Sequence, residues 1–156
     1  MGGKHSRIEL GKYLEIHEAA MRGLEGKRYV LGHNLRIERV ASGLLMEGRI
    51  ECQGGIAIDV DKLLAILLGV GEGAIVQTTA YTYHVQLQGF GPLLRYCGPH
   101  IDHNQFHHKH TYDVLAGDIE GTVTQVDADD RPTLAEVITE ACEWYFANAQ
   151  QVEMRR

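Results

Sequence analysis

The sequence predicts an α+β fold in which an antiparallel β-sheet meander carries an N-terminal and a C-terminal α-helix packed on it. Three observations predict it: a helical apolar period near the start, alternating segments between glycine-rich turns in the middle, and a capped helical period near the end. The chain has 156 residues, 44% of them apolar and 23% charged, which argues against disordered, collagen-like and coiled-coil proteins. We expect a single domain over residues 1–156, because this length suits one hydrophobic core.

Two segments have the apolar spacing of amphipathic helices. The first covers residues 9–25 and ends before Gly26, a residue typical of helix C-termini. Its apolar face consists of Leu10, Tyr13, Leu14, His17, Met21 and Leu24. The second begins after Thr133, where Thr133 and Glu136 form a capping-box sequence behind Pro132. Its expected buried stripe is Leu134, Val137, Ile138, Ala141, Tyr145 and Phe146.

The residues between these helices have the period of β-strands. Segments 35–40, 44–52 and 56–60 have alternating apolar and polar residues and are separated by glycine-rich turns. Segment 61–69 fits either a helical turn or a buried strand. Segment 74–88 looks like the longest strand, and 93–97 follows it after a turn at 89–92. The inward residues expected in the two best-patterned segments are Leu44, Met46, Ile50 and Cys52, and Ile75, Tyr81, Tyr83, Val85 and Leu87. Gly117 and Gly121 bracket an acidic loop or edge hairpin.

Charge and cysteine content limit the compartment and the class of protein. The net charge of −6 argues against a general nucleic-acid coating protein but permits an enzyme that acts on RNA. The three cysteines form no C-x-x-C pair, which suits a reducing cytosol. The start has no apolar run typical of a secretory signal, and the longest apolar stretch, 63–70, is far shorter than the ~20 residues of a membrane helix. We therefore expect a cytoplasmic protein with no membrane contact.

Histidine is concentrated in one short segment. Five of the nine histidines lie between residues 100 and 110, and they are His100, His103, His107, His108 and His110. The Gly98-Pro99 pair breaks the preceding strand, so we expect the first two histidines on a loop. Residues 106–114 then read as a strand that places His108 and His110 on one face and His107 and Lys109 on the other.

One chemistry that needs such a cluster is acid–base cleavage of a phosphodiester. Two imidazoles can remove the proton of an attacking 2′-hydroxyl and protonate the leaving oxygen, because unperturbed histidine titrates near neutral pH. His108 and His110 are the main candidates and His107 is the third. Arg95 and Lys109 would stabilise the negative charge of the transition state. No metal or other cofactor is required for this reaction, which would make the protein a ribonuclease.

Two alternatives remain open at this level. His108 and His110 could chelate a divalent metal such as zinc, with His103 or His100 from the loop as a further ligand and Asp102 or Asp113 as an oxygen donor. The histidines could instead shape a surface that binds a partner protein without catalysis. His100, His103 and Tyr83 are the candidate substrate contacts, although the spacing of Tyr83 fits a core residue better. For Cys97, a buried thiol is a better interpretation than a nucleophile.

The second half of the chain resembles the TumE-like toxin family. The resemblance lies in four motifs: YTYHVQLQ (81–88), LLRYCGPHIDH (93–103), FHHKHTYD (106–113) and RPTLAEVI (131–138). The shared residues are Tyr81, Tyr83, Arg95, Tyr96, His100, His107, His108, Lys109 and His110. The chain departs from the family pattern at Cys97-Gly98, where the family tends to have Asp-Asn.

The resemblance implies the toxin half of a type II toxin–antitoxin pair, with RNA as the suspected substrate and a small helix-turn-helix antitoxin as the partner. Together with the histidine chemistry, it predicts a TumE-like, metal-independent ribonuclease in the cytoplasm. The alternative is a non-catalytic metal-binding or antitoxin-neutralised protein. An exposed strand edge could also support a homo-oligomer.

Overall fold

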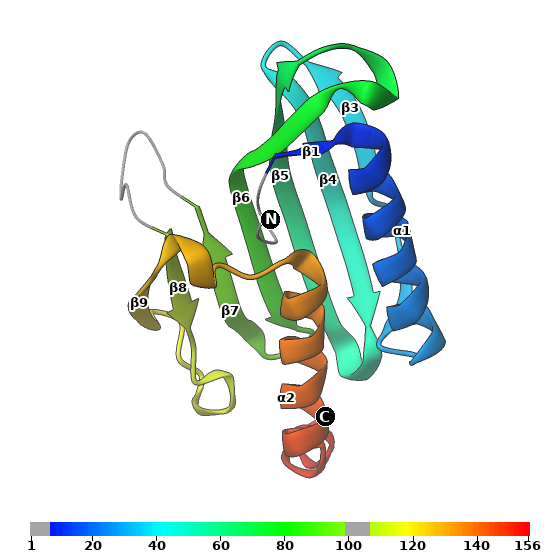
Figure 1. The fold of residues 1–156 in the computed structure, drawn as a ribbon. Coiled ribbons are helices and arrows are strands. Elements are labelled where there is room, and N and C mark those ends of the chain that lie inside the picture. The colour runs from blue at the N-terminus through cyan, green and yellow to red at the C-terminus, as the bar shows by residue number, and fades with distance from the viewer. Residues whose placement is uncertain (1–6, 99–106) are drawn as a thin grey trace.

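The computed structural model describes residues 7–98 and 107–156, which form nine antiparallel strands and two α-helices (Figure 1). The helices are α1 (Leu10–Gly26) and α2 (Leu134–Met154). The strands are β1 (Ile8–Glu9), β2 (Val30–His33), β3 (Arg36–Val40), β4 (Gly43–Cys52), β5 (Ile56–Leu68), β6 (Ile75–Leu87), β7 (Gly91–Cys97), β8 (His107–Thr111) and β9 (Thr122–Val126). The predicted α+β class, with a helix near each end of an antiparallel sheet, is confirmed.

The sheet is a meander in which most strands pair with their neighbours along the chain. The strand order is β2-β4-β5-β6-β7-β8-β9, with β3 also paired to β4 and β1 to β6. Every pairing is antiparallel. Consecutive antiparallel strands need only short turns, which is why the glycine-rich segments of the sequence fall between strands.

Both helices cover the same face of the sheet, so the core lies between this helix-covered face and the two helices (Figure 1). Met21 and Leu24 of α1 and Val137 and Ile138 of α2 are buried in one cluster with inward residues of the strands. The strand residues of that cluster include Met46, Ile50, Ile58, Val60, Tyr81, Tyr83, Val85 and Leu87. The opposite face of the sheet, called here the open face, carries no helix of the described residues.

The second helix starts where the capping sequence predicts. Thr133 Oγ1 accepts the backbone N–H of Glu136 at 3.2 Å, and the Glu136 carboxylate accepts the N–H of Thr133 at 3.0 Å. Leu134, Val137, Ile138 and Ala141 are buried as predicted, followed by Cys142 and Val152. The prediction for Phe146 is wrong, because its side chain is 52% exposed. Val152 instead lies eighteen positions after Leu134, which equals five helical turns and returns to the buried face.

The ambiguous segment 61–69 forms part of a strand. β5 continues without interruption to Leu68, hydrogen-bonded to β4 on one side and β6 on the other. Periodicity could not distinguish a helix from a strand here, but pairing on both edges does. β6 has thirteen residues, the same length as β5.

A β-bulge changes the face of the residues at the start of β6. Strict alternation predicts Ile75 on the same face as Tyr81 and Tyr83, but Val76 is fully buried and Ile75 is half-buried. Along β5, Leu63 pairs with Ala80 and Leu64 with Thr78, so one residue of β6 is skipped. An extra residue on one strand reverses inward and outward positions beyond it, which explains the error.

Four further segments differ from the sequence-based predictions. Strands β1, β2 and β9 were not expected, and β9 lies at one edge of the sheet. β8 ends at Thr111, earlier than the predicted end of its strand, because the chain turns into a short 3-10 helix over Val114–Ala116.

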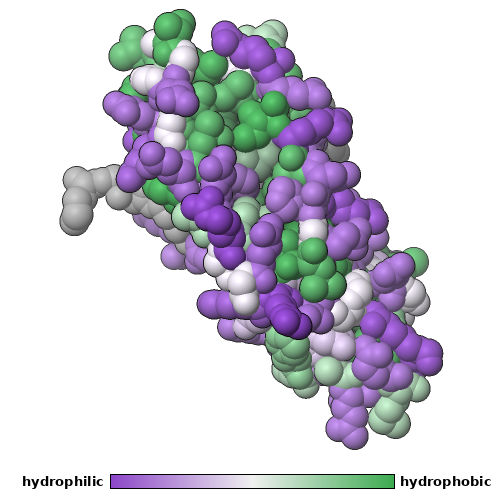
Figure 2. All heavy atoms as spheres, turned by 90° about the vertical axis from the view of Figure 1, so that its right-hand side faces the viewer, coloured by the Kyte–Doolittle hydropathy of each residue, from purple (hydrophilic) through white to green (hydrophobic). Residues whose placement is uncertain are grey.

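A cavity of about 400 Å³ lies between α1 and the β2–β4 region of the sheet. Its lining residues are Leu14, His17, Glu18, Met21, Arg22, Glu25, His33, Leu35, Ile37 and Met46. Figure 2 shows the side of the molecule on which α1 lies, where apolar side chains gather between polar ones. Among the described residues, no helix combines the length and the apolar character needed to cross a membrane.

Candidate functional site

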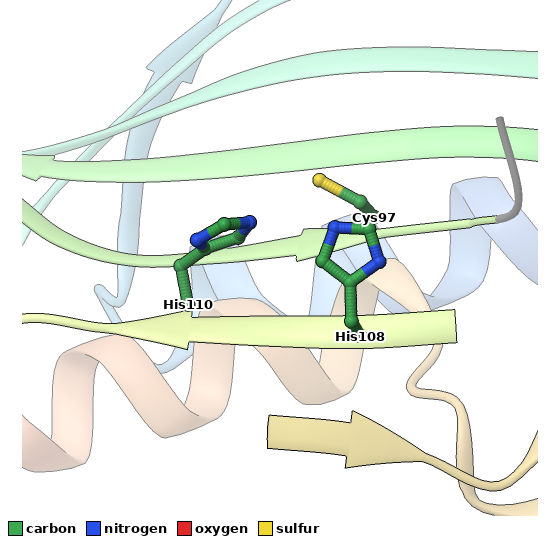
Figure 3. A group of neighbouring side chains, drawn as sticks. All are labelled: Cys97, His108 and His110. Atoms are coloured by element: carbon green, nitrogen blue, oxygen red, sulfur yellow. The ribbon is translucent and has the colours of Figure 1, made fainter. Parts of the chain in front are cut away.

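Pairing between β7 and β8 brings together side chains from both ends of the histidine segment. Cys97 pairs with His108, and Arg95 pairs with His110. Cross-strand partners project from the same face of a sheet, and residues two apart on one strand do so as well. All four side chains therefore lie on the open face, where Figure 3 shows the rings of His108 and His110 beside the thiol of Cys97.

The thiol and the two imidazoles form a compact group. One ligand atom from each of Cys97, His108 and His110 lies within 4.8 Å of the others. The two rings meet edge to face, with 5.0 Å between their centroids and 71° between their planes. Cys97 is 2% exposed and His108 is 7% exposed, whereas His110 is half-buried. The group is thus largely shielded from solvent and is most open at His110.

Arg95 supplies positive charge to this group. Its Nη2 lies 3.1 Å from Nε2 of His110. Since a guanidinium only donates hydrogen bonds, Nε2 of His110 is the acceptor and carries no proton in this arrangement. The Nε atom of Arg95 is buried and has no hydrogen-bond partner among the described residues. Such an unused buried donor is rare in folded proteins.

The environment favours the uncharged forms of His110 and Cys97. Burial lowers the pKa of His110, and the positive charge of Arg95 and the nearby His108 and His84 lower it further. Burial raises the pKa of the Cys97 thiol, while the charge and hydrogen bond of Arg95 act in the opposite direction. A neutral imidazole can accept a proton or bind a metal, so both of the chemistries predicted from the sequence remain available.

The cluster lies at one end of a row of charged and polar side chains that crosses the open face. The cross-strand pairs Arg49–Asp59, Asp59–His84, His84–Arg95 and Arg95–His110 follow one another from β4 to β8. Arg49 donates two hydrogen bonds to the Asp59 carboxylate, at 2.8 and 3.1 Å. Burial lowers the pKa of His84, and the charge of Arg95 lowers it further. Alternation places His84 on the polar face of its strand, but only the register shows that it borders Arg95.

His107 and Lys109 lie on the helix-covered face, opposite His108 and His110, as the alternation of β8 predicts. Nδ1 of His107 is hydrogen-bonded to the Tyr81 hydroxyl at 2.9 Å. Lys109 forms an ion pair with Glu140 of α2 and lies over the ring of Tyr96, 5.0 Å from its centroid. The five proposed catalytic residues are therefore divided between two faces, and only Arg95, His108 and His110 are brought together.

Of the candidate substrate contacts, only Tyr83 lies among the described residues, and it is not beside this cluster. Tyr83 is 1% exposed in the core on the helix-covered face. Burial raises its pKa, which keeps the hydroxyl neutral. The predicted roles of His100 and His103, and the oxygen ligand Asp102, fall on residues outside those that the structure describes.

Two cationic residues of the helix-covered face were not singled out from the sequence. Lys62 is 8% exposed, with its Nζ 5.0 Å from the centroid of the Tyr13 ring. Burial lowers its pKa to about 8, and the charge of Arg131 contributes. Nη1 of Arg131 lies 3.5 Å from Nε2 of His107. Alternation along the strand is the one sequence signal for Lys62, because it continues the inward positions Ile56, Ile58 and Val60.

The arrangement on the open face permits two kinds of chemistry. Two neighbouring imidazoles with a guanidinium can transfer protons at a phosphodiester, and a thiol with two imidazoles can ligate a metal ion. Comparisons with family models, with curated proteins and with solved structures find no match to this chain. The resemblance to the TumE-like toxins therefore stays a prediction, and the functional argument rests on the residues themselves.

Proposed function

We propose that this protein is a TumE-like toxin-type ribonuclease whose acid–base pair is His108 and His110 and whose phosphate-binding residue is Arg95. The observation that carries the proposal is the juxtaposition of these three side chains on one face of β7 and β8. The ring centroids are 5.0 Å apart, so both imidazoles can reach oxygens bonded to one phosphorus atom. The reaction needs no metal.

Arg95 links phosphate binding to the activation of His110 as a general base. In the structure its Nη2 donates to Nε2 of His110. A phosphodiester carries negative charge, and guanidinium binds phosphate oxygens in preference to a neutral nitrogen. Transfer of this hydrogen bond to phosphate leaves the lone pair of His110 Nε2 available as a general base. The unused Nε donor of Arg95 gives the guanidinium a second group for a phosphate oxygen.

The proposed reaction is an internal transesterification of RNA. His110 removes the proton of the 2′-hydroxyl, the 2′-oxygen forms a bond to phosphorus, and the bond from phosphorus to the 5′-oxygen breaks. Protonated His108 gives its proton to that leaving oxygen, so the products are a 2′,3′-cyclic phosphate and a 5′-hydroxyl. Arg95 stabilises the additional negative charge on the phosphoryl oxygens as it develops.

His107 and Lys109 have a supporting role in this proposal. Their contacts lead to Tyr81 and to Glu140 of α2 on the helix-covered face. These contacts attach β8 to the helix-covered side of the fold and do not reach the imidazoles of the open face. Substitution of either residue is expected to lower stability more than it alters the chemical step.

The toxin assignment adds a partner. A small helix-turn-helix antitoxin that binds this chain should carry basic patches, because the chain has a net charge of −6. The exposed edge strand β9, with the uncharged sequence TVTQV, is one position where such a partner or a second copy could pair. A strongly acidic cognate partner would contradict the charge argument.

RNA cleavage by the full chain tests the proposal directly. Purified protein without a histidine tag should cleave a single-stranded RNA oligonucleotide in the presence of a chelator and leave the 2′-deoxy oligonucleotide intact. The variant His108→Ala/His110→Ala should lose cleavage at least 100-fold, since each acid–base group contributes about 10²-fold or more. His107→Gln, on the same strand but the opposite face, is the matched control and should retain cleavage.

Two outcomes would refute the mechanism. Cleavage of the 2′-deoxy oligonucleotide would exclude the 2′-hydroxyl as nucleophile, and full cleavage by the folded double variant would exclude the histidine pair. Expression in a bacterial host gives an independent readout. The wild-type chain should arrest growth, and the double variant should not.

A further inference from the structure

A thiol joins the two imidazoles of the open face, although the acid–base reaction does not use it. Cys97 lies directly across from His108 in the β7–β8 ladder, and its sulfur, with one nitrogen from each imidazole, falls within a 4.8 Å group. We propose that Cys97, His108 and His110 form a binding site for a thiophilic divalent metal ion of the zinc class. The site shares both imidazoles with the proposed ribonuclease but does not require that activity, and Cys97 takes the place of His103 in the ligand set suggested by the sequence.

The donor set selects the class of metal. Zinc in proteins is commonly bound by cysteine thiolates together with histidine imidazoles, whereas magnesium and calcium require oxygen donors. A tetrahedral zinc with sulfur at ~2.3 Å and nitrogen at ~2.0–2.1 Å separates its ligand atoms by about 3.3–3.6 Å. The largest separation in the group is 4.8 Å or less, so small side-chain rotations close the site.

The fold holds the ligands close together before any metal binds. His108 and His110 are two residues apart on β8, and Cys97 is fixed by the antiparallel register. Cys97 and His108 are also buried, so their side chains have little conformational freedom to lose. Three protein ligands leave the fourth tetrahedral position for water or another small ligand.

Arg95 competes with a metal for the same position. Its guanidinium donates to Nε2 of His110, a lone pair that a metal could use. A cation bound by the three ligands would displace this hydrogen bond and be repelled by the guanidinium charge. On binding, the Cys97 thiol releases its proton to solvent and the sulfur forms a bond to the metal. Loss of Arg95 should therefore strengthen metal binding, while loss of Cys97 should weaken it.

Cobalt and zinc titrations of the full, untagged chain test the site. Stoichiometric Co²⁺ should give a thiolate-to-cobalt charge-transfer absorption band, and Zn²⁺ should displace Co²⁺ and abolish the band. Cys97→Ser, a substitution of similar volume, should remove the band and lower zinc affinity at least 100-fold, because even outer-shell substitutions cost about 10–100-fold. Arg95→Gln should raise zinc affinity at least tenfold relative to the wild-type chain.

His107→Gln is the matched control, because it removes an imidazole from the same strand on the opposite face. It should keep both the band and the zinc affinity of the wild-type chain. The absence of a charge-transfer band in the folded wild-type chain would overturn the proposal. A band that persists in Cys97→Ser, or is lost in His107→Gln, would overturn it as well. None of these readouts requires RNA cleavage, so they decide the metal site whether or not the ribonuclease proposal holds.

Discussion

Lys62 offers a quantitative test of how the helix-covered face is built. This lysine is 8% exposed on β5, and its ammonium lies over the ring of Tyr13. Arg131 and His17 are the other titratable groups coupled to its charge. Burial is the main reason that its pKa falls from 10.5 to about 8. We predict that Lys62→Met, which keeps an unbranched side chain of similar length, stabilises the protein at neutral pH.

The magnitude follows from the pKa. A tenfold change in proton affinity corresponds to about 1.4 kcal/mol, so the charged form of buried Lys62 costs about 3 kcal/mol below pH 8. The contact with Tyr13 returns about 1 kcal/mol of this. The expected gain for Lys62→Met at pH 7 is therefore about 2–3 kcal/mol in the free energy of unfolding.

The sign of the pH dependence is fixed by linkage. The pKa of Lys62 is lower in the folded than in the unfolded state, so the unfolded chain binds more protons between about pH 8 and 10.5. The wild-type chain should gain stability as the pH rises through this window. The gain from Lys62→Met should accordingly shrink toward zero above pH 10.

Urea unfolding of the wild-type and Lys62→Met chains at pH 7, 8.5 and 10 measures this difference. Tyrosine and other groups that titrate in this range cancel, since both chains contain them. Lys12→Met removes an exposed lysine of α1, whose side chain is 62% exposed, and should change stability by less than about 0.5 kcal/mol at every pH. A destabilised Lys62→Met chain at pH 7, or a difference that does not vary with pH, would refute the reasoning.

Four further predictions concern the cap of α2, two glycines and the site. Thr133→Ala removes the capping box of α2 and should lower the free energy of unfolding by about 1 kcal/mol, measured by urea unfolding; an unchanged value would show that the cap is dispensable. Gly23→Ala, in α1 where an added Cβ meets no atom within 4 Å, should raise stability by about 0.5–1 kcal/mol. Gly43→Ala should instead destabilise strongly, because its Cβ would lie 2.1 Å from the carbonyl oxygen of Leu64, and thermal melting that ranks these two variants the other way would contradict the structure. If both the ribonuclease and the metal proposals hold, one equivalent of zinc should stop RNA cleavage and a chelator should restore it, since both use the same imidazoles. Cleavage by the zinc-loaded chain would show that metal binding and catalysis do not use the same imidazoles.

Local sequence determined the parts of this protein that depend on neighbouring residues. The start of α2 was predictable because the capping box is formed by residues three positions apart. It was also predictable that His107 and Lys109 lie on the opposite face of the sheet from His108 and His110, because successive side chains of any strand point to opposite faces. Neither feature needs a contact with a distant part of the chain.

The tertiary structure decided everything that depends on register between strands. Segment 61–69 became a strand because β4 and β6 pair with both of its edges. The bulge between β5 and β6 moved Val76 into the core and Ile75 toward the surface. The same kind of long-range pairing placed Cys97 opposite His108 and Arg95 opposite His110. Composition and periodicity carry no information about which residues of two strands face each other, since register is set by hydrogen bonds and packing between them.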